Sequence, residues 1–152
     1  MELVIGESVK ETNRVFVKSY TEEYCKAITE NYRQYHIRTL KGNLSGNYPE
    51  YARQQLDEIE NGTANLMKFE IREGKKYYKI VQVEFDTFQN RNEYKDSSVH
   101  SFVDKNTGDV FKPASWKAPA KHVRYSFCNM TDFKMLLNPR QLDWAGGYLY
   151  MR

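Results

Sequence analysis

Residues 67–85, MKFEIREGKKYYKIVQVEF, carry the pattern that decides the fold. In its first half, Met67, Phe69 and Ile71 alternate with charged residues, and this period of two is typical of a half-buried β-strand. Gly74 lies among charged residues and predicts a turn. A second apolar series follows the turn: Tyr77, Val81, Val83 and Phe85. The stretch therefore predicts two consecutive strands joined by a tight turn.

The residues before this stretch have a helical period instead. Apolar residues recur at steps of three and four between 19 and 42, which predicts an amphipathic helix. They are Tyr20, Tyr24, Ala27, Ile28, Tyr32 and Tyr35. Ser19 and Glu22 have the spacing of a capping box, so we expect the helix to begin there and to end at Gly42.

A second helix is predicted from Pro49 to the Asn61-Gly62 pair, because proline suits a first helical turn and glycine a helix end. Its apolar stripe consists of Tyr48, Ala52, Leu56 and Ile59. A short loop separates the two helices, so they are expected to form an αα-hairpin.

After the first two strands, residues 99–104 and 109–113 predict a further hairpin, closed by Gly108 in a left-handed conformation. If Asp104 opposes Asp109, the register follows: Phe102 opposite Phe111, His100 opposite Pro113, Val103 opposite Val110 and Val99 opposite Ala114. Both faces are then apolar, so we expect both to be covered, or one to bind a partner. The helices cover one face. We expect the C-terminal apolar residues to cover the other: Phe133, Leu136, Leu137, Leu142 and Trp144.

Together these elements predict a single α+β domain over residues 19–152. It consists of a helical hairpin packed on a mainly antiparallel sheet of about four strands, with a short C-terminal helical tail. The polar residues 86–96 are expected to form a connection or a long hairpin tip. Residues 1–18 contain two β-prone runs, at 3–5 and 15–17, which predict an N-terminal arm or added strands.

Composition narrows the class of protein. With 40% hydrophobic and 28% charged residues, the 152-residue chain is expected to be globular rather than disordered. A net charge of +3 does not by itself imply a polyanionic partner. Cys25 and Cys128 are isolated, which predicts two reduced thiols in a cytosolic protein. No export signal and no apolar run of membrane-spanning length is visible, so no membrane association is expected.

The segment 112–125 is the strongest candidate for a binding site, because no acidic residue lies between Asp109 and Asp132. It carries four cations and two rings: Lys112, Trp116, Lys117, Lys121, Arg124 and Tyr125. Basic side chains bind phosphate and aromatic rings stack on bases. Pro113 and Pro119 are expected to hold the segment extended.

A structural alternative for this segment is that Trp116 fills the core while the lysines solvate a surface loop. The apolar hairpin beside Trp116 slightly favours the core position for this ring.

Catalytic signals are weak. His36, His100 and His122 stand singly, without metal-ligand spacing, and no phosphate loop or nucleophile elbow is present. No metal and no cofactor is therefore predicted. His100 and Asp104 are expected on the same face of the hairpin, and they are weak candidates for an oriented general base. Cys128 lies near Arg124 and His122, which would lower its pKa, but a small buried thiol is the favoured interpretation.

The C-terminal half resembles a known family. KKYYKIV, SSVHSFVDKNTGDVFKPASWKAPAKHVRYSF and DWAGGYLYMR, taken in this order, are similar to a family of small, functionally unassigned bacteriophage proteins, over about residues 75–152. The positions that match its motif are His100, Asp104, Gly108, Lys112, Trp116, Lys117 and Lys121. The resemblance implies a phage origin and a location in the host bacterial cytoplasm, or alternatively in the virion, but no mechanism.

The first functional hypothesis is a non-enzymatic phage accessory protein that binds a phosphate-bearing ligand, nucleic acid or a nucleotide signal, through residues 112–125. The alternative is a protein–protein module, either a virion or assembly component or an inhibitor of a host protein. A small hydrolase that uses His100 is the third and least supported hypothesis.

Overall fold

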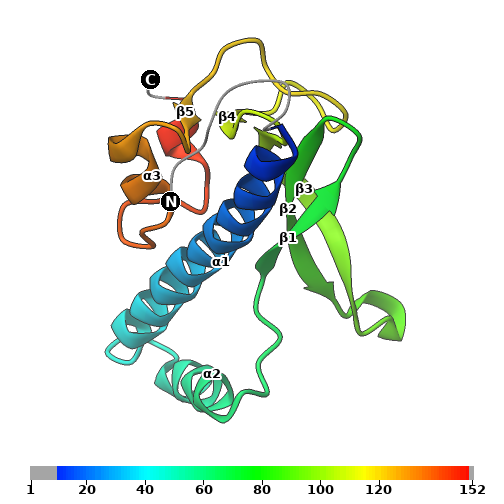
Figure 1. The fold of residues 1–152 in the computed structure, drawn as a ribbon. Coiled ribbons are helices and arrows are strands. Elements are labelled where there is room, and N and C mark those ends of the chain that lie inside the picture. Colours follow the sequence, from blue (N-terminus) through cyan, green and yellow to red (C-terminus); the bar gives the residue numbers. More distant parts are fainter. Residues whose placement is uncertain (1–9, 151–152) are drawn as a thin grey trace.

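The computed structural model describes residues 10–150, which form an α+β fold with an antiparallel sheet (Figure 1). The helices are α1 (Lys10–Asn43), α2 (Pro49–Asn61) and α3 (Met130–Leu136), with 3₁₀ helices η2 (Phe88–Asn90) and η3 (Gly147–Leu149). The strands are β1 (Lys68–Glu73), β2 (Tyr77–Asp86), β3 (Glu93–Asp104), β4 (Asp109–Phe111) and β5 (Tyr125–Ser126). They lie in sequence order, each antiparallel to the next. The predicted class, helical hairpin and short C-terminal helix are confirmed, with five strands instead of about four.

Helix α1 begins earlier than predicted, so part of the segment predicted as β-prone is helical. Residues 15–17 are helical, and Ser19 is an exposed residue inside the helix rather than its cap. The reason is burial: Val17, Tyr20, Tyr24 and Ile28 are all buried at steps of three and four, so packing overrides the β preference of valine. The β-strand run predicted at 15–17 is therefore wrong, and the run at 3–5 lies outside the described residues.

One face of the sheet is covered by α1, which crosses it diagonally in Figure 1. The buried core lies at this inner face and contains Val17, Tyr20, Tyr24, Ile28, Phe69, Tyr78, Ile80, Val103, Val110 and Phe127. The C-terminal residues Leu136, Leu142 and Leu149 belong to the same core. The prediction that the C-terminal segment covers the second face of the sheet is thus wrong.

Helix α2 packs beside the far end of α1 and buries Ala52. Gly62 ends it as predicted, with φ +76° and its N–H donated to the carbonyls of Glu58 and Ile59. Tyr48, predicted as part of the apolar stripe, precedes the helix and is 80% exposed.

Strand β3 contains two irregularities that change which side chains face the core. Ile80 pairs with Ser101 and Val81 with Val99, so His100 is an extra residue on β3. Such a bulge turns two consecutive side chains to one side of the sheet. The second irregularity lies further along, between Gln82 and Val83.

The register predicted for the second hairpin is confirmed at Phe102–Phe111 and Val103–Val110. It does not continue to His100 and Pro113, because β4 ends at Phe111. The bulge places His100 on the inner face, where it contacts Phe69 of the core. The prediction that His100 shares a face with Asp104 is therefore wrong.

Strand residues that alternate with the core residues form the outer face, and no described helix lies over it in Figure 1. Its apolar residues are nevertheless buried: Val81, Val83, Phe102 and Phe111. Tyr77 packs edge-on against both Phe102 and Phe111, with ring centroids 6.0 Å apart in each case. These rings, and Lys79 whose Nζ lies over the Phe102 ring, contribute to the cover.

Candidate functional site

The basic segment does not run extended but folds back on itself after β4. Pro113 and Pro119 face each other in an isolated antiparallel bridge, and the Ala120 N–H donates to the Lys112 carbonyl at 2.8 Å. At the tip, the Ser115 hydroxyl oxygen accepts hydrogen bonds from the backbone N–H groups of Lys117 and Ala118. This loop, residues 112–120, presents Trp116 and Lys117 at its turn.

Trp116 is 45% exposed, so the expectation that it fills the core is wrong. Its ring lies beside Lys79 of β2, whose Nζ is 5.7 Å from the Trp116 centroid and 5.9 Å from that of Phe102. A lysine between two rings is attracted to both by cation–π interaction. The contact holds the loop tip against the outer face of the sheet.

A cavity of about 310 Å³ opens next to this contact; we call it the outer-face pocket. Its walls are the β1–β2 turn, the adjoining parts of β2 and β3, and the loop tip. The lining residues are Arg72, Glu73, Gly74, Lys75, Lys76, Tyr77, Lys79, Phe102 and Lys117. The volume lies at the lower end of the range for small-ligand sites.

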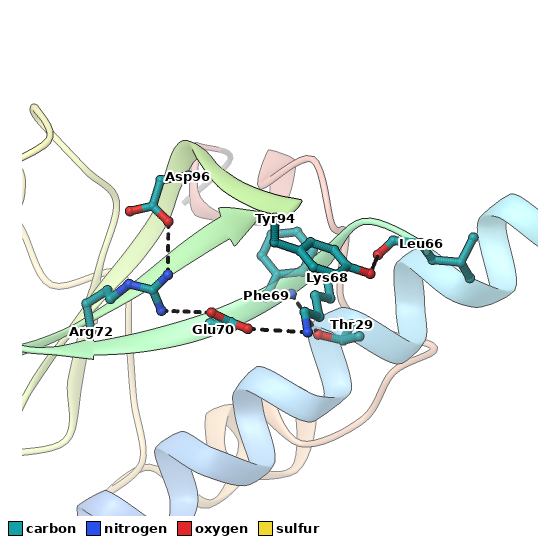
Figure 2. A network of polar contacts seen from close by, with 8 residues as sticks. All are labelled: Thr29, Leu66, Lys68, Phe69, Glu70, Arg72, Tyr94 and Asp96. Atoms are coloured by element: carbon teal, nitrogen blue, oxygen red, sulfur yellow. Dashed lines mark hydrogen bonds and ion pairs between the residues drawn. The ribbon is translucent and has the colours of Figure 1, made fainter. Parts of the chain in front are cut away.

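The charges around the outer-face pocket are unequally paired. Lys105 donates to the Glu73 carboxylate at 2.6 Å, which lowers the pKa of Glu73. Arg72 is paired with Glu70 at 3.0 Å and with Asp96 at 2.9 Å, as Figure 2 shows. Among the described residues, the structure pairs no carboxylate with four pocket lysines: Lys75, Lys76, Lys79 and Lys117. The pocket therefore combines positive charge with the aromatic rings of Tyr77, Phe102 and nearby Trp116.

The structure divides the six binding residues predicted in segment 112–125. Lys117 lines the outer-face pocket, Trp116 lies beside the pocket residue Lys79, and Lys121 is exposed just beyond the loop. Lys112 instead lies over the Tyr150 ring, 4.7 Å from its centroid. Arg124 and Tyr125 adjoin or form β5: the Arg124 N–H donates to the Val110 carbonyl, and the Tyr125 hydroxyl donates to the Tyr148 carbonyl at 2.9 Å. These six residues therefore do not form one surface.

Sequence reasoning missed the contribution of the β1–β2 turn to this pocket. The turn sequence REGKKYYK, residues 72–79, interleaves cations with tyrosines in the same manner as segment 112–125. Its composition was a usable signal. What the sequence alone did not reveal is that the loop after β4 returns to the outer face and places Lys117 beside this turn.

A second polar cluster lies inside the core, beside the bulge in β3. The Tyr24 and Tyr148 hydroxyls are 2.6 Å apart, Tyr24 is 3.0 Å from the Ser101 hydroxyl, and Tyr148 is 2.7 Å from His100 Nε2. A hydrogen bond with the Trp144 backbone raises the pKa of His100. Ser101, Tyr24, Tyr148 and His100 thus form one continuous chain of hydrogen bonds.

Burial determines the protonation states in this cluster. It lowers the pKa of His100 to about 4, against the smaller opposing effects of the Trp144 backbone and Asp143. It also raises the pKa of Tyr24 and Tyr148 well above their usual range. All four side chains are thus neutral near pH 7, and the chain of hydrogen bonds satisfies polar groups inside the core.

The candidate pair for general base catalysis is not assembled. The Asp104 carboxylate accepts hydrogen bonds from the backbone N–H groups of Asn106 and Thr107, and so stabilises the β3–β4 turn. His100 is bonded to Tyr148 on the other face and is 7% exposed. His100 is therefore a member of the buried hydrogen-bond network of the core.

Both cysteines are free thiols, as predicted. Cys25 is buried, and burial raises its pKa to about 12. Cys128 is exposed rather than buried, and its Sγ donates to the Thr107 carbonyl at 3.3 Å. Desolvation raises its pKa, so the lowered pKa considered from the neighbouring cations is wrong.

Within residues 10–150, no group of three or more His, Cys, Asp and Glu side chains is placed to hold a metal ion. None of the described helices is both long and apolar enough to cross a membrane.

Comparison with known proteins gives one match. No curated protein and no solved structure matches the chain significantly. The match is to the model of a family of unknown function, DUF7717, and it extends over residues 2–151. Because this range includes nearly the whole chain, helices and sheet together, the protein belongs to the DUF7717 family.

Proposed function

We propose that this protein is a non-enzymatic binder of a phosphate-bearing ligand, either a nucleic acid or a nucleotide, and that the ligand binds at the outer-face pocket. The observation that supports this proposal is the set of four lysines without a carboxylate partner among the described residues, next to exposed aromatic surface. Cations on flexible stems bind phosphate oxygens, and a half-exposed indole offers a face for a base.

The arrangement of the pocket suits one phosphate group with an attached ring better than a long duplex. The lysines lie around one small cavity, whereas duplex binding requires cations spread along a face. The Trp116 ring lies beside Lys79, which lines the cavity. A ligand that places its phosphate among the lysines therefore brings its base close to the indole. A phage origin and a bacterial cytoplasmic location form part of the proposal, supported by the resemblance of residues 75–152.

Fluorescence anisotropy with a fluorescein-labelled oligothymidylate of ten nucleotides and with a labelled ATP analogue tests the proposal. We expect Lys79→Ala combined with Lys117→Ala to weaken binding by at least about tenfold, because two charge-assisted contacts are lost. Lys121→Ala is the matched control, since it removes an exposed lysine close to the loop but outside the pocket. Equal binding by the double variant and the native protein would refute the proposed site.

Salt dependence provides an independent check of the same proposal. Four lysines that each contact one phosphate of a single strand give a log–log slope no steeper than about −3. A markedly steeper slope would indicate a larger basic surface than the outer-face pocket.

A protein–protein module is the second candidate, and a specific observation favours it: strand β1 has an open edge beside a groove. This edge is independent of the outer-face pocket.

A further inference from the structure

Strand β1 is the first strand of the sheet, and its pairing with β2 shows which backbone groups face away from the sheet. The Gly74 N–H donates to the Tyr77 carbonyl at the turn, so in this register the hydrogen-bonded positions of β1 are Arg72, Glu70 and Lys68. Phe69 and Ile71 alternate with them and point their N–H and C=O groups to the open edge. The Phe69 N–H follows this alternation, because it points away from β2 and donates to the Thr29 hydroxyl of α1 at 3.1 Å (Figure 2).

Next to this edge lies a groove of about 560 Å³ between α1 and β1; we call it the edge groove. Helix α1 forms one wall from Glu22 to Glu30, including Cys25 and Lys26, and Lys68 to Ile71 of β1 form the other. At one end of the groove, the Thr29 hydroxyl accepts the hydrogen bond of the Phe69 edge N–H. For the Ile71 backbone N–H and C=O, which point toward the groove, the structure gives no partner among the described residues.

The outer-face side chains of the strand that borders the groove are paired with one another and with β3. Lys68, Glu70 and Arg72 form a row of ion pairs that continues to Asp96 on β3, with distances of 3.4, 3.0 and 2.9 Å (Figure 2). Lys68 Nζ also lies 4.2 Å from the centroid of the Tyr94 ring, whose hydroxyl donates to the Leu66 carbonyl. Two of these side chains, Lys68 and Glu70, also border the groove, and the contacts leave the edge N–H and C=O of Ile71 without a partner among the described residues.

We propose that the edge groove binds a short extended peptide segment of a partner protein, which adds antiparallel to β1 and pairs with Ile71. The backbone of Ile71 presents one N–H and one C=O at the edge, and an extended polypeptide supplies the complementary acceptor and donor at strand spacing. The apolar groups of Cys25 and Ile71 receive a side chain of the peptide. The groove is lined by three carboxylates, of Glu22, Glu30 and Glu70, and by two lysines, Lys26 and Lys68. Glu22 is the carboxylate to which the structure gives no cationic partner among the described residues, so a basic residue beside the apolar one is favoured.

The dimensions of the groove select a short peptide over a second copy of the chain. The helical wall from Glu22 to Glu30 is about 12 Å long at 1.5 Å per residue, which corresponds to about four residues of an extended strand. A stable dimer buries about 1,200–2,000 Å² in total, far more than a contact of this length provides. The Thr29 hydroxyl already accepts from the Phe69 N–H, which further shortens the stretch of β1 that can pair with an added strand.

The test uses a displayed library of random twelve-residue peptides, selected on the full chain. We expect selected peptides to bind Ile71→Pro at least about tenfold more weakly, because proline removes both the edge N–H and the Ile71 side chain from the groove. The ladder with β2 stays intact in this variant, since the Ile71 N–H is not part of it, and edge strands tolerate proline at such positions. Glu73→Pro is the matched control: it removes an edge N–H of the same parity outside the groove.

A second measurement keeps the proposal falsifiable if Ile71→Pro is unstable. On the native chain, amide hydrogen exchange at Ile71 is expected to slow on addition of a selected peptide, while exchange at Phe69, already bonded to Thr29, changes little. Failure to select any peptide, unchanged Ile71 exchange with a bound peptide, or self-association of the chain through β1 in sedimentation would each overturn the proposal.

Discussion

His100 owes its position to one extra residue in β3. Without the bulge, strand alternation would place it on the outer face with Phe102, among the lysines; with the bulge, it lies beside Ser101 at the inner face and completes the Tyr24–Tyr148 network. A period of two in the sequence gives no indication of such an insertion, and so the site expected around His100 and Asp104 does not form. At the same scale, the exposure of Trp116 depends on a loop that no local pattern describes.

The buried imidazole makes stability depend on pH. Its pKa is about 4 in the folded chain and about 6.5 when unfolded, so between these values the unfolded state binds more protons. The free energy of unfolding is therefore expected to fall as the pH is lowered from 6.5 towards 4, by up to about 1.4 kcal/mol per pH unit. Urea denaturation near pH 7 and pH 5 measures this difference. In His100→Gln, which has no titrating group at this position, the dependence is expected to be smaller; an equal dependence in both proteins would contradict the account.

Trp116→Ala separates binding from stability. Because the ring is 45% exposed and lies outside the core, the substitution is expected to cost less than about 1 kcal/mol of unfolding free energy. Tyr24→Phe provides the contrast: it removes a hydroxyl from the core network and is expected to cost about 1–3 kcal/mol. Thermal melting of both variants checks the order, and a larger loss for Trp116→Ala would restore the core position for this ring.

At the scale of elements, the sequence predicted what depends on local periodicity. The strands on either side of Gly74, the register of Phe102 with Phe111, and the end of α2 at Gly62 were all correct. The start of α1 was not, because the helical burial of Val17 outweighs its preference for strands, and Ser19 with Glu22 imitates a cap. The edge of β1 and its groove depend on which strand lacks a second neighbour, a property of the assembled sheet.

Asn31 joins α1 to the C-terminal segment and went unnoticed in the sequence. Its Nδ2 donates to the carbonyls of Pro139 and Leu142 at 2.8 and 2.7 Å, and its Oδ1 accepts from the Trp144 N–H at 2.8 Å. Asn31→Ala leaves three half-buried backbone groups without these partners, so a loss of about 2–3 kcal/mol is expected. Urea denaturation tests this value against Gln34→Ala, one turn further and exposed, which is expected to change stability by less than about 0.5 kcal/mol. Equal effects would show that Asn31 does not anchor the segment.

The whole molecule has two faces with different roles. Helix α1 and the C-terminal segment together cover the inner face and enclose the core. On the outer face, apolar residues are buried against aromatic rings and Lys79. The outer-face pocket arises where residues about 40 positions apart meet, at the β1–β2 turn and the tip of loop 112–120. Three of its four lysines lie in residues 72–79 and the fourth, Lys117, lies at the loop tip, so the complete set depends on the tertiary fold.

The most direct test of phosphate-ligand binding at the outer-face pocket is the fluorescence of Trp116 itself. Trp144→Phe leaves Trp116 as the single tryptophan and keeps an aromatic ring against Tyr32. Titration of this variant with ATP and with oligothymidylate is expected to change the Trp116 emission saturably, and the effect is expected to weaken with added salt and to disappear when Lys79 and Lys117 are replaced by alanine. Binding detected by anisotropy without any change in Trp116 emission, or no binding to either ligand, would contradict the account.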